Sequence, residues 1–180
     1  MAVVKNNYVK RGVQEKANAK ATIRYIQNRP GQDKAKTSRS LFGWDGAMGR
    51  YDAYRMIDEA EKGSVFYRFM LSPDPKQEDT KQDLALREVT EKMMLRLEEH
   101  IKKQVQWVGA IHADHAPHRH VHIVAVVPGR LQKQEFEALP HVLRSAATEA
   151  ALEQRQELDL AREQQEQERE REEAAWERSH

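Results

Sequence analysis

Two aliphatic runs flank five histidines in the stretch WVGAIHADHAPHRHVHIVAVV, residues 107–127. Short apolar runs bounded by polar turns are typical of buried strands. We therefore predict strands over 105–113 and 120–127, joined by a short polar loop. The second run is apolar at both even and odd positions, which indicates a central strand covered on both faces. This hairpin is the element around which we expect the rest of the domain to form.

The segments outside this hairpin alternate between strand and helix patterns. Residues rich in β-branched and aromatic side chains predict strands over 2–10 and 64–72. Runs of helix-forming residues that end at helix-breaking residues predict helices over 13–29, 48–62 and 80–104. Thr80 is the predicted N-cap of the third helix. Residues 30–46 are polar and contain glycine, which predicts an exposed loop. The order favours an α+β fold with a central antiparallel sheet and helices packed on it.

The composition fits one modest domain of a cytoplasmic protein. Apolar residues make up 39% of the 180 residues and charged residues 33%. No apolar run is long enough to span a bilayer, and the first residues lack the apolar core of a secretory signal. The chain has no cysteine, which excludes disulfides, thiolate zinc ligands and iron–sulfur clusters.

The net charge of +1 conceals an uneven distribution. Residues 1–50 carry eleven Lys/Arg and three Asp/Glu, a net of +8, which indicates either an anionic partner such as a nucleic acid or a solvated basic face. Residues 151–180 carry five Lys/Arg and ten Asp/Glu, a net of −5, without a heptad seam. We predict one functional domain over 1–145. Over 146–180 we predict a charged segment, a solvated helix or largely disordered, that is either a helical tail or a linker to a further C-terminal region.

The histidines at the start of the second strand predict a metal site. Alternate residues of a strand share a face, so His120 and His122 point the same way. An antiparallel hairpin brings His112 opposite this pair, and Asp114 could orient one imidazole from behind. Three neutral nitrogen ligands leave coordination positions open, which is typical of a catalytic site. His118 has the same parity and remains an alternative to His122.

A three-histidine site by itself fits hydrolases, oxygenases and phosphoryl-transfer enzymes alike. The segment AKATIRYIQNRPG, residues 19–31, narrows the choice together with IHADHAPHRHVHIVAVV, residues 111–127. The two closely resemble, in order and spacing, motifs of the mobilisation relaxases of conjugative and mobilisable plasmids, MobA-like members of the His-hydrophobe-His endonucleases. The resemblance covers about residues 1–130. The loop departs from the family pattern, since it carries extra histidines and its proline precedes His118, which leaves the exact triad open.

The resemblance implies a chemistry and a set of partners. Tyr25 is then the nucleophile, and the histidines hold a divalent ion such as Mg²⁺ or Mn²⁺. The enzyme nicks single-stranded DNA at an origin of transfer, forms a 5′-phosphotyrosine adduct, and works with accessory relaxosome proteins and a coupling protein. The basic residues that flank Tyr25 either hold phosphates or are solvated, and they are Lys20, Arg24 and Arg29.

Two other functions compete with this hypothesis. A rolling-circle replication initiator uses the same chemistry, but commonly places its tyrosine after the histidines, and here no tyrosine follows Tyr67. A metal-binding or DNA-binding module without cleavage activity is the alternative from a different class. For Tyr25 itself the alternative role is an aromatic anchor at a helix end. Tyr8, Tyr51 and Tyr54 are rival nucleophiles, although Tyr51 and Tyr54 are expected to pack their helix.

Overall fold

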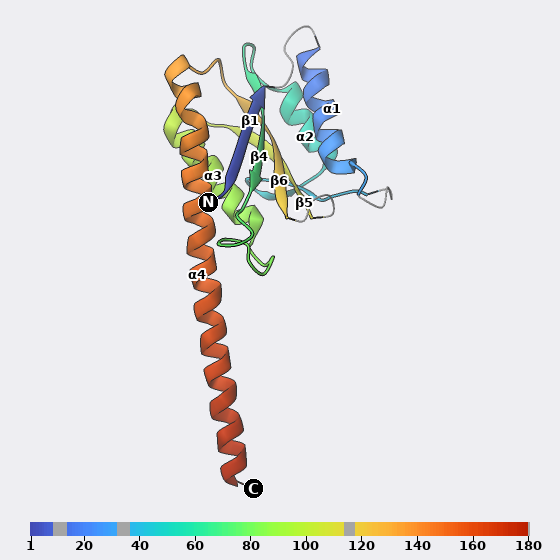
Figure 1. Cartoon of the computed structure of the whole chain (residues 1–180). Helices are drawn as coiled ribbons and strands as arrows, with labels where there is room; N and C mark the ends of the chain where they lie inside the picture. The colour runs from blue at the N-terminus through green and yellow to red at the C-terminus, as the bar shows by residue number, and fades with distance from the viewer. Residues whose placement is uncertain (9–13, 32–36, 114–117, 180) are drawn as a thin grey trace.

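The computed structural model describes residues 1–8, 14–31, 37–113 and 118–179. Its strands are β1 (Val3–Tyr8), β2 (Leu41–Gly43), β3 (Gly46–Met48), β4 (Val65–Ser72), β5 (Gln106–His112) and β6 (His120–Val127). Its helices are α1 (Glu15–Asn28), α2 (Arg50–Asp58), α3 (Leu86–Ile101) and α4 (Lys133–Ser179). The predicted α+β class, with a central antiparallel sheet, packed helices and a charged C-terminal helix, is confirmed (Figure 1).

The six strands form one sheet in the order β1-β4-β6-β5-β2-β3, and every neighbouring pair is antiparallel. The hairpin predicted from 105–113 and 120–127 is β5 and β6, paired from Gln106 opposite Val126 to His112 opposite His120. β6 lies between β4 and β5, so it is the central strand that its apolar residues at both parities indicate.

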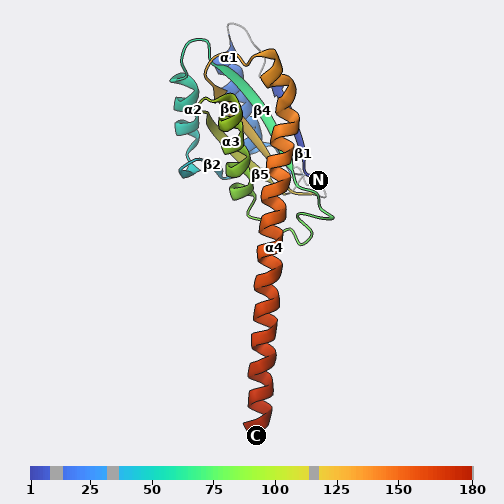
Figure 2. The same cartoon turned by 90° about the vertical axis from the view of Figure 1, so that its left-hand side faces the viewer.

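Alternate residues of β6 enter two separate cores. The odd positions, Val121, Ile123, Ala125 and Val127, pack with α3 and α4 on one face. Val124 and Val126 pack with α1 and α2 on the other. Figures 1 and 2 show the two helix pairs on opposite sides of the sheet.

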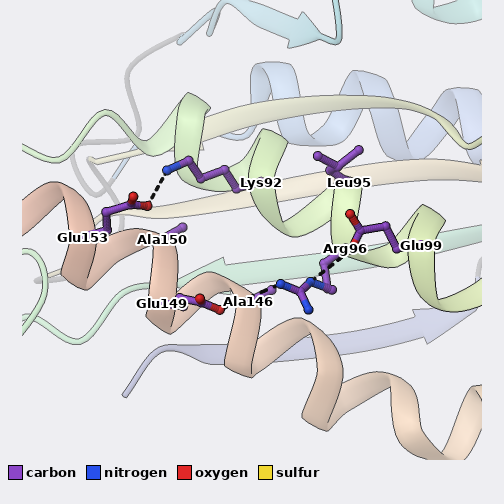
Figure 3. A pocket seen from close by; sticks show the side chains of 8 residues that line it. All are labelled: Lys92, Leu95, Arg96, Glu99, Ala146, Glu149, Ala150 and Glu153. Carbon is purple, nitrogen blue, oxygen red and sulfur yellow. Dashed lines mark hydrogen bonds and ion pairs between the residues drawn. The ribbon is translucent and has the colours of Figure 1, made fainter.

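Small side chains let α4 approach α3 closely. The alanines of α4 that are buried in this contact are Ala146, Ala147, Ala150 and Ala151. Ion pairs close the outer edge of the contact, where Lys92 Nζ lies 2.6 Å from Glu153 Oε2 and Arg96 Nη2 lies 3.9 Å from Glu149 Oε2 (Figure 3). Because these charged groups are about half exposed or more, they contribute little beside the buried alanines.

The helix α4 crosses residue 145 without a break and continues far beyond the sheet (Figure 1). Its packed part includes Arg155, which is buried and pairs with Asp83 at 2.6 Å, and reaches Leu158. From Leu160 to Arg178 its side chains are exposed. The charged tail is therefore a solvated helix in this structure.

Two predictions about local structure are wrong. The predicted exposed loop over 30–46 contains β2, where Leu41 and Phe42 are buried and pair with β5. Residues 32–36 of that loop lie outside the described part. Thr80 is not an N-cap, because α3 begins at Leu86 and residues 80–82 form turns.

No helix in the described part of the chain is both long and apolar enough to cross a membrane.

Candidate metal centre and its cavity

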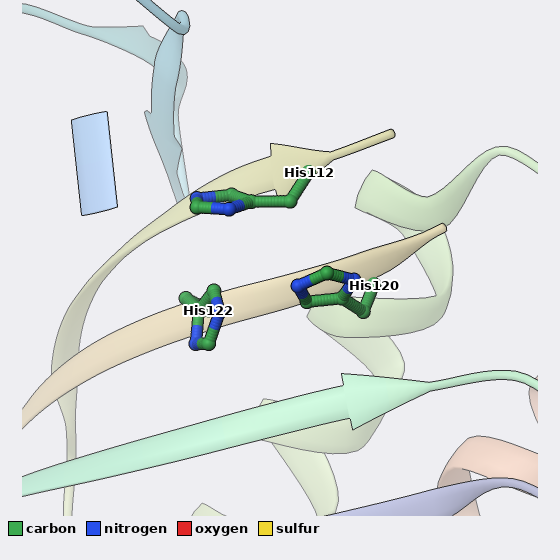
Figure 4. Close-up of side chains that lie close together, drawn as sticks. All are labelled: His112, His120 and His122. Carbon is green, nitrogen blue, oxygen red and sulfur yellow. The ribbon is translucent and has the colours of Figure 1, made fainter. Parts of the chain in front are cut away.

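The hairpin register brings three histidines together on the α1 side of the sheet. His112 ends β5 directly opposite His120, and His122 follows two residues later, opposite Ala110. Direct cross-strand partners and residues two apart share a face, so all three imidazoles converge (Figure 4). One ligand nitrogen from each ring can be chosen so that all three lie within 4.8 Å of one another.

The rings are close and shielded from solvent. The centroid of the His122 ring lies 4.6 Å from that of His112 and 5.0 Å from that of His120. His112 is completely buried, and His120 is 8% exposed. The residues that the spacing and parity of the sequence select are therefore the ones that meet in space.

Backbone carbonyls orient two of the imidazoles. His112 Nε2 lies 2.7 Å from the carbonyl oxygen of Ile26, near the end of α1. His120 Nδ1 lies 3.3 Å from the carbonyl oxygen of His118. A carbonyl can only accept, so each of these nitrogens carries the proton. The lone pair is thereby placed on Nδ1 of His112 and on Nε2 of His120. Such outer contacts are what fix metal-ligating histidines in their working tautomer.

His122 shows most directly that the cluster suits a cation. Its Nε2 is buried and has no hydrogen-bond partner among the described residues. Burial, followed in decreasing order by the charges of the neighbouring His112, His120, Arg29 and Arg68, lowers the pKa of His122 from its ordinary value near 6.5 to about 3. The imidazole is therefore neutral at pH 7, which is the form that binds a metal. Three neutral ligands would leave the full charge of a divalent ion available to a substrate.

Tyr25 lies beside this cluster. A cavity of about 370 Å³ is lined by Tyr25, Arg29, Arg68 and His122, among others. The tyrosine ring is 51% exposed, and the guanidinium of Arg29 lies 5.6 Å from the ring centroid. A substrate entering the cavity would therefore meet the phenol, two cations and one ligand histidine together.

The other four tyrosines lie elsewhere. Tyr8 and Tyr67 face the opposite side of the sheet, where the ring of Tyr8 stacks on Phe136. Tyr54 packs partly into the α1–α2 core, as expected, but Tyr51 is 82% exposed, so the prediction that it packs is wrong.

The remaining predicted residues divide between the cavity and the surface. Arg29 lines the cavity, Arg24 is exposed, and Lys20 turns toward α2, where its Nζ lies 2.5 Å from Asp58 Oδ2. His118, the alternative ligand, is exposed and lies outside the cluster. Asp114 lies outside the described residues, as does the loop residue His115.

Two contributors are not apparent from the sequence patterns. Arg68 is the only charged residue of β4, and a lone cation within an otherwise apolar and aromatic strand is the signal that could have identified it. Arg119 forms a two-pronged ion pair with the buried Asp79, with nitrogen–oxygen distances of 2.8 and 2.6 Å, and also donates to the Leu84 carbonyl. This pair fixes the chain immediately before His120.

Comparison with protein-family models, curated proteins and solved structures gives no significant match.

Proposed function

We propose that this chain is a metal-dependent DNA relaxase: a site- and strand-specific endonuclease that nicks single-stranded DNA at an origin of transfer for conjugative transfer or mobilisation. One observation carries the proposal. Tyr25, on the first helix, shares a cavity with the partly buried His122 of a three-histidine cluster formed by two strands much later in the chain. A solvent-accessible phenol beside a group of neutral imidazoles is the arrangement that tyrosine-based phosphodiester cleavage needs.

The histidines would hold Mg²⁺ or Mn²⁺, and the bound ion would supply positive charge to the non-bridging oxygens of the scissile phosphate. Arg29 and Arg68 line the same cavity and present guanidinium groups suited to phosphate oxygens. Neutral ligands leave this site strongly positive, which favours an anionic substrate over a neutral one.

Tyr25 would attack the phosphorus atom through its phenolic oxygen. The new bond joins that oxygen to phosphorus, and the bond from phosphorus to the 3′ oxygen breaks. The phenol loses its proton and the departing 3′ oxygen gains one, so no nucleotide or other co-reactant is consumed. The product is a 5′-phosphotyrosine and a free 3′-hydroxyl, and the reverse reaction reseals the strand. In a cell, accessory relaxosome proteins and a coupling protein would act on this adduct.

The test is an adduct assay with a pool of single-stranded oligonucleotides of randomised sequence, in Mn²⁺ or Mg²⁺. The wild-type chain should give a slower-migrating, protease-sensitive band on a denaturing gel, and the recovered DNA identifies the nick site. Tyr25→Phe should remove the band, because only the reacting oxygen is lost. Tyr51→Phe is the matched control, since that phenol is exposed but lies outside the cavity.

Two results would count against the proposal. An adduct that survives in Tyr25→Phe would place the nucleophile at another tyrosine. Metal and DNA binding without an adduct from any oligonucleotide would favour the binding module.

A further inference from the structure

One half of the metal-bearing sheet face has no helix over it. On β1 and β4 the positions that share a face with His122 are Val3, Lys5, Asn7, Phe66, Arg68, Met70 and Ser72. Phe66 is buried in the α1–α2 core, and we call the other six positions the open sheet face. None of the six is buried, whereas Val124 and Ala110, on the same face of β6 and β5, are fully covered by the α1–α2 core. The cover supplied by α1 and α2 therefore reaches β4 only at Phe66 and stops before Arg68.

The cavity that contains Tyr25 lies along this boundary. Arg68 belongs both to the cavity lining and to the open sheet face. In register, His122 lies opposite Met70, and Met70 lies opposite Lys5, so one straight row leads from the metal cluster to the sheet edge. Adjacent strands are roughly 4.8 Å apart, so Lys5 lies about 10 Å from His122 along this row.

The open sheet face is positive and carries no opposing charge. Lys5 and Arg68 are exposed, and neither forms an ion pair with any described residue. No acidic residue occupies an outward position of β1 or β4, although acidic residues make up 29 of the 180 residues. Two cations left without partners, on a surface that leads into an active-site cavity, are suited to a polyanion.

We propose that the open sheet face is the path along which a single DNA strand runs into or out of the cavity. This inference rests on the proposed function and adds the substrate's route to it. Grooves for single strands combine cations that follow the backbone with flat or apolar side chains that contact bases. Here Lys5 and Arg68 would follow the phosphates, while Val3 and the half-buried Met70 offer apolar contacts. The row from His122 to Lys5 is long enough for about two or three nucleotides.

The test measures binding without cleavage. A fluorescein-labelled single-stranded 20-nucleotide oligonucleotide is titrated in metal-free buffer at several salt concentrations, and fluorescence anisotropy gives the affinity. The variants are Lys5→Gln and Arg68→Gln, which keep the long side-chain stem and remove the charge. Arg144→Gln is the control, because Arg144 is an exposed cation on α4, across the sheet. Each test variant should reduce the slope of log K against log salt by about 0.7, and the double variant by about 1.4, while the control matches wild type.

A second measurement uses the absence of cysteine from the chain. Asn7→Cys, on the open sheet face, should crosslink to an oligonucleotide that carries a thiol-reactive tether, and Arg144→Cys should not.

The inference is overturned if Lys5→Gln and Arg68→Gln bind with the wild-type affinity and salt slope while the wild type still forms its adduct. In that case the strand takes another route and the proposed function stands. A wild-type chain that neither binds single strands nor forms an adduct would overturn both. If Lys5→Gln and Arg68→Gln lost as much affinity for a duplex oligonucleotide as for the single strand, the preference for a single strand would be contradicted.

Discussion

The two faces of the central sheet have the same strands but opposite character. Toward α3 and α4, the sheet presents an almost wholly apolar face that includes Val121 and Ile123 and is covered along its length. Toward α1 and α2, the cover extends over β5 and β6 and reaches Leu41 of β2 and Phe66 of β4, and the ends of β5 and β6 carry the histidines. β1, and β4 from Arg68 onward, leave this second face open beside the cluster. Stability is concentrated on the closed face, and the groups capable of chemistry are on the other.

The difference arises within single strands. In β6 the side chain at one position enters the closed core while its neighbour enters the histidine cluster, because successive residues point to opposite faces. Substitutions one residue apart should therefore have unrelated consequences. A slip of the β5–β6 register by one residue would bury the histidines in the apolar core, so the closed face also determines where the ligands lie.

The largest expected contrast is between His122→Ala and Ile123→Ala. Removing the His122 ligand should lower Mn²⁺ affinity by more than roughly 100-fold, since even the loss of an outer-shell partner costs 10-fold to 100-fold. Ile123→Ala leaves a hole in the closed core and should lower the free energy of unfolding by about 2–5 kcal/mol, with Mn²⁺ affinity retained in the folded fraction.

Titration calorimetry and urea denaturation separate these two effects. His118→Ala is the control for His122→Ala, because the His118 side chain is exposed and outside the cluster. If His118→Ala abolished Mn²⁺ binding while His122→Ala preserved it, the ligand triad would be shifted by two residues.

Substitution of the Asp79–Arg119 pair tests whether a buried ion pair stabilises the segment immediately before His120. Asp79→Asn leaves the guanidinium of Arg119 without its buried partner and should cost about 3 kcal/mol in the free energy of unfolding, at the lower end for broken buried pairs because Arg119 is 18% exposed. Glu153→Gln is the matched control, since it breaks the exposed pair with Lys92 and should cost less than about 1 kcal/mol. Thermal or urea unfolding of both variants gives the comparison. Equal losses would show that the buried pair has no special role.

Most of the fold was predictable because it follows from local patterns. The apolar runs of β5 and β6 and the parity of His120 and His122 are visible in the sequence, and they predict both the hairpin and the cluster. The assignment of Tyr25 rests on a motif resemblance and on its place in the cavity. Its role as nucleophile stays a prediction.

What the sequence did not reveal depends on distant partners. β2 has only three residues, and Leu41 and Phe42 become a strand through pairing with β5. Gly109 provides the space for this pairing, because a Cβ there would lie 3.0 Å from the Phe42 ring. Asp79 lies in a polar turn segment, and its sequence context predicts an exposed carboxylate. Only the folded chain brings Arg119 into contact with it. Arg68 gains its significance only when β4 is placed beside β6.

The pH dependence of folding should also differ between the two faces. In the folded chain the pKa of His122 is lowered to about 3, whereas in the unfolded chain it returns to about 6.5. The unfolded state therefore binds one more proton than the folded state between these values. The stability from this residue is fully present above pH 6.5 and is lost as the pH falls toward 3. His122→Asn should make the decline of the unfolding free energy with falling pH shallower, by an amount that corresponds to up to one bound proton. The measurement is the urea-unfolding free energy from pH 7 to 4.5 in metal-free buffer. Ile123→Val, on the closed face, should leave the slope unchanged.

The smallest effect on the free energy of unfolding is expected from removing the end of α4. Comparing two truncated chains then shows where the domain ends. A chain that stops at residue 162 keeps the buried alanines and retains Arg155 and Arg162 on Asp83, while losing only exposed side chains. Its free energy of unfolding should differ from that of the full chain by less than about 0.5 kcal/mol, as is usual for exposed surface. A chain that stops at residue 145 also loses Ala147, Ala150 and Ala151 from the closed core, and should unfold at a much lower urea concentration. Near-native stability in the shorter chain would place the boundary at 145, as the sequence predicts. If the chain ending at 145 is much less stable while the chain ending at 162 keeps its stability, the domain boundary moves to the last packed turn of α4. The solvated turns beyond that point contribute no buried surface to the closed face.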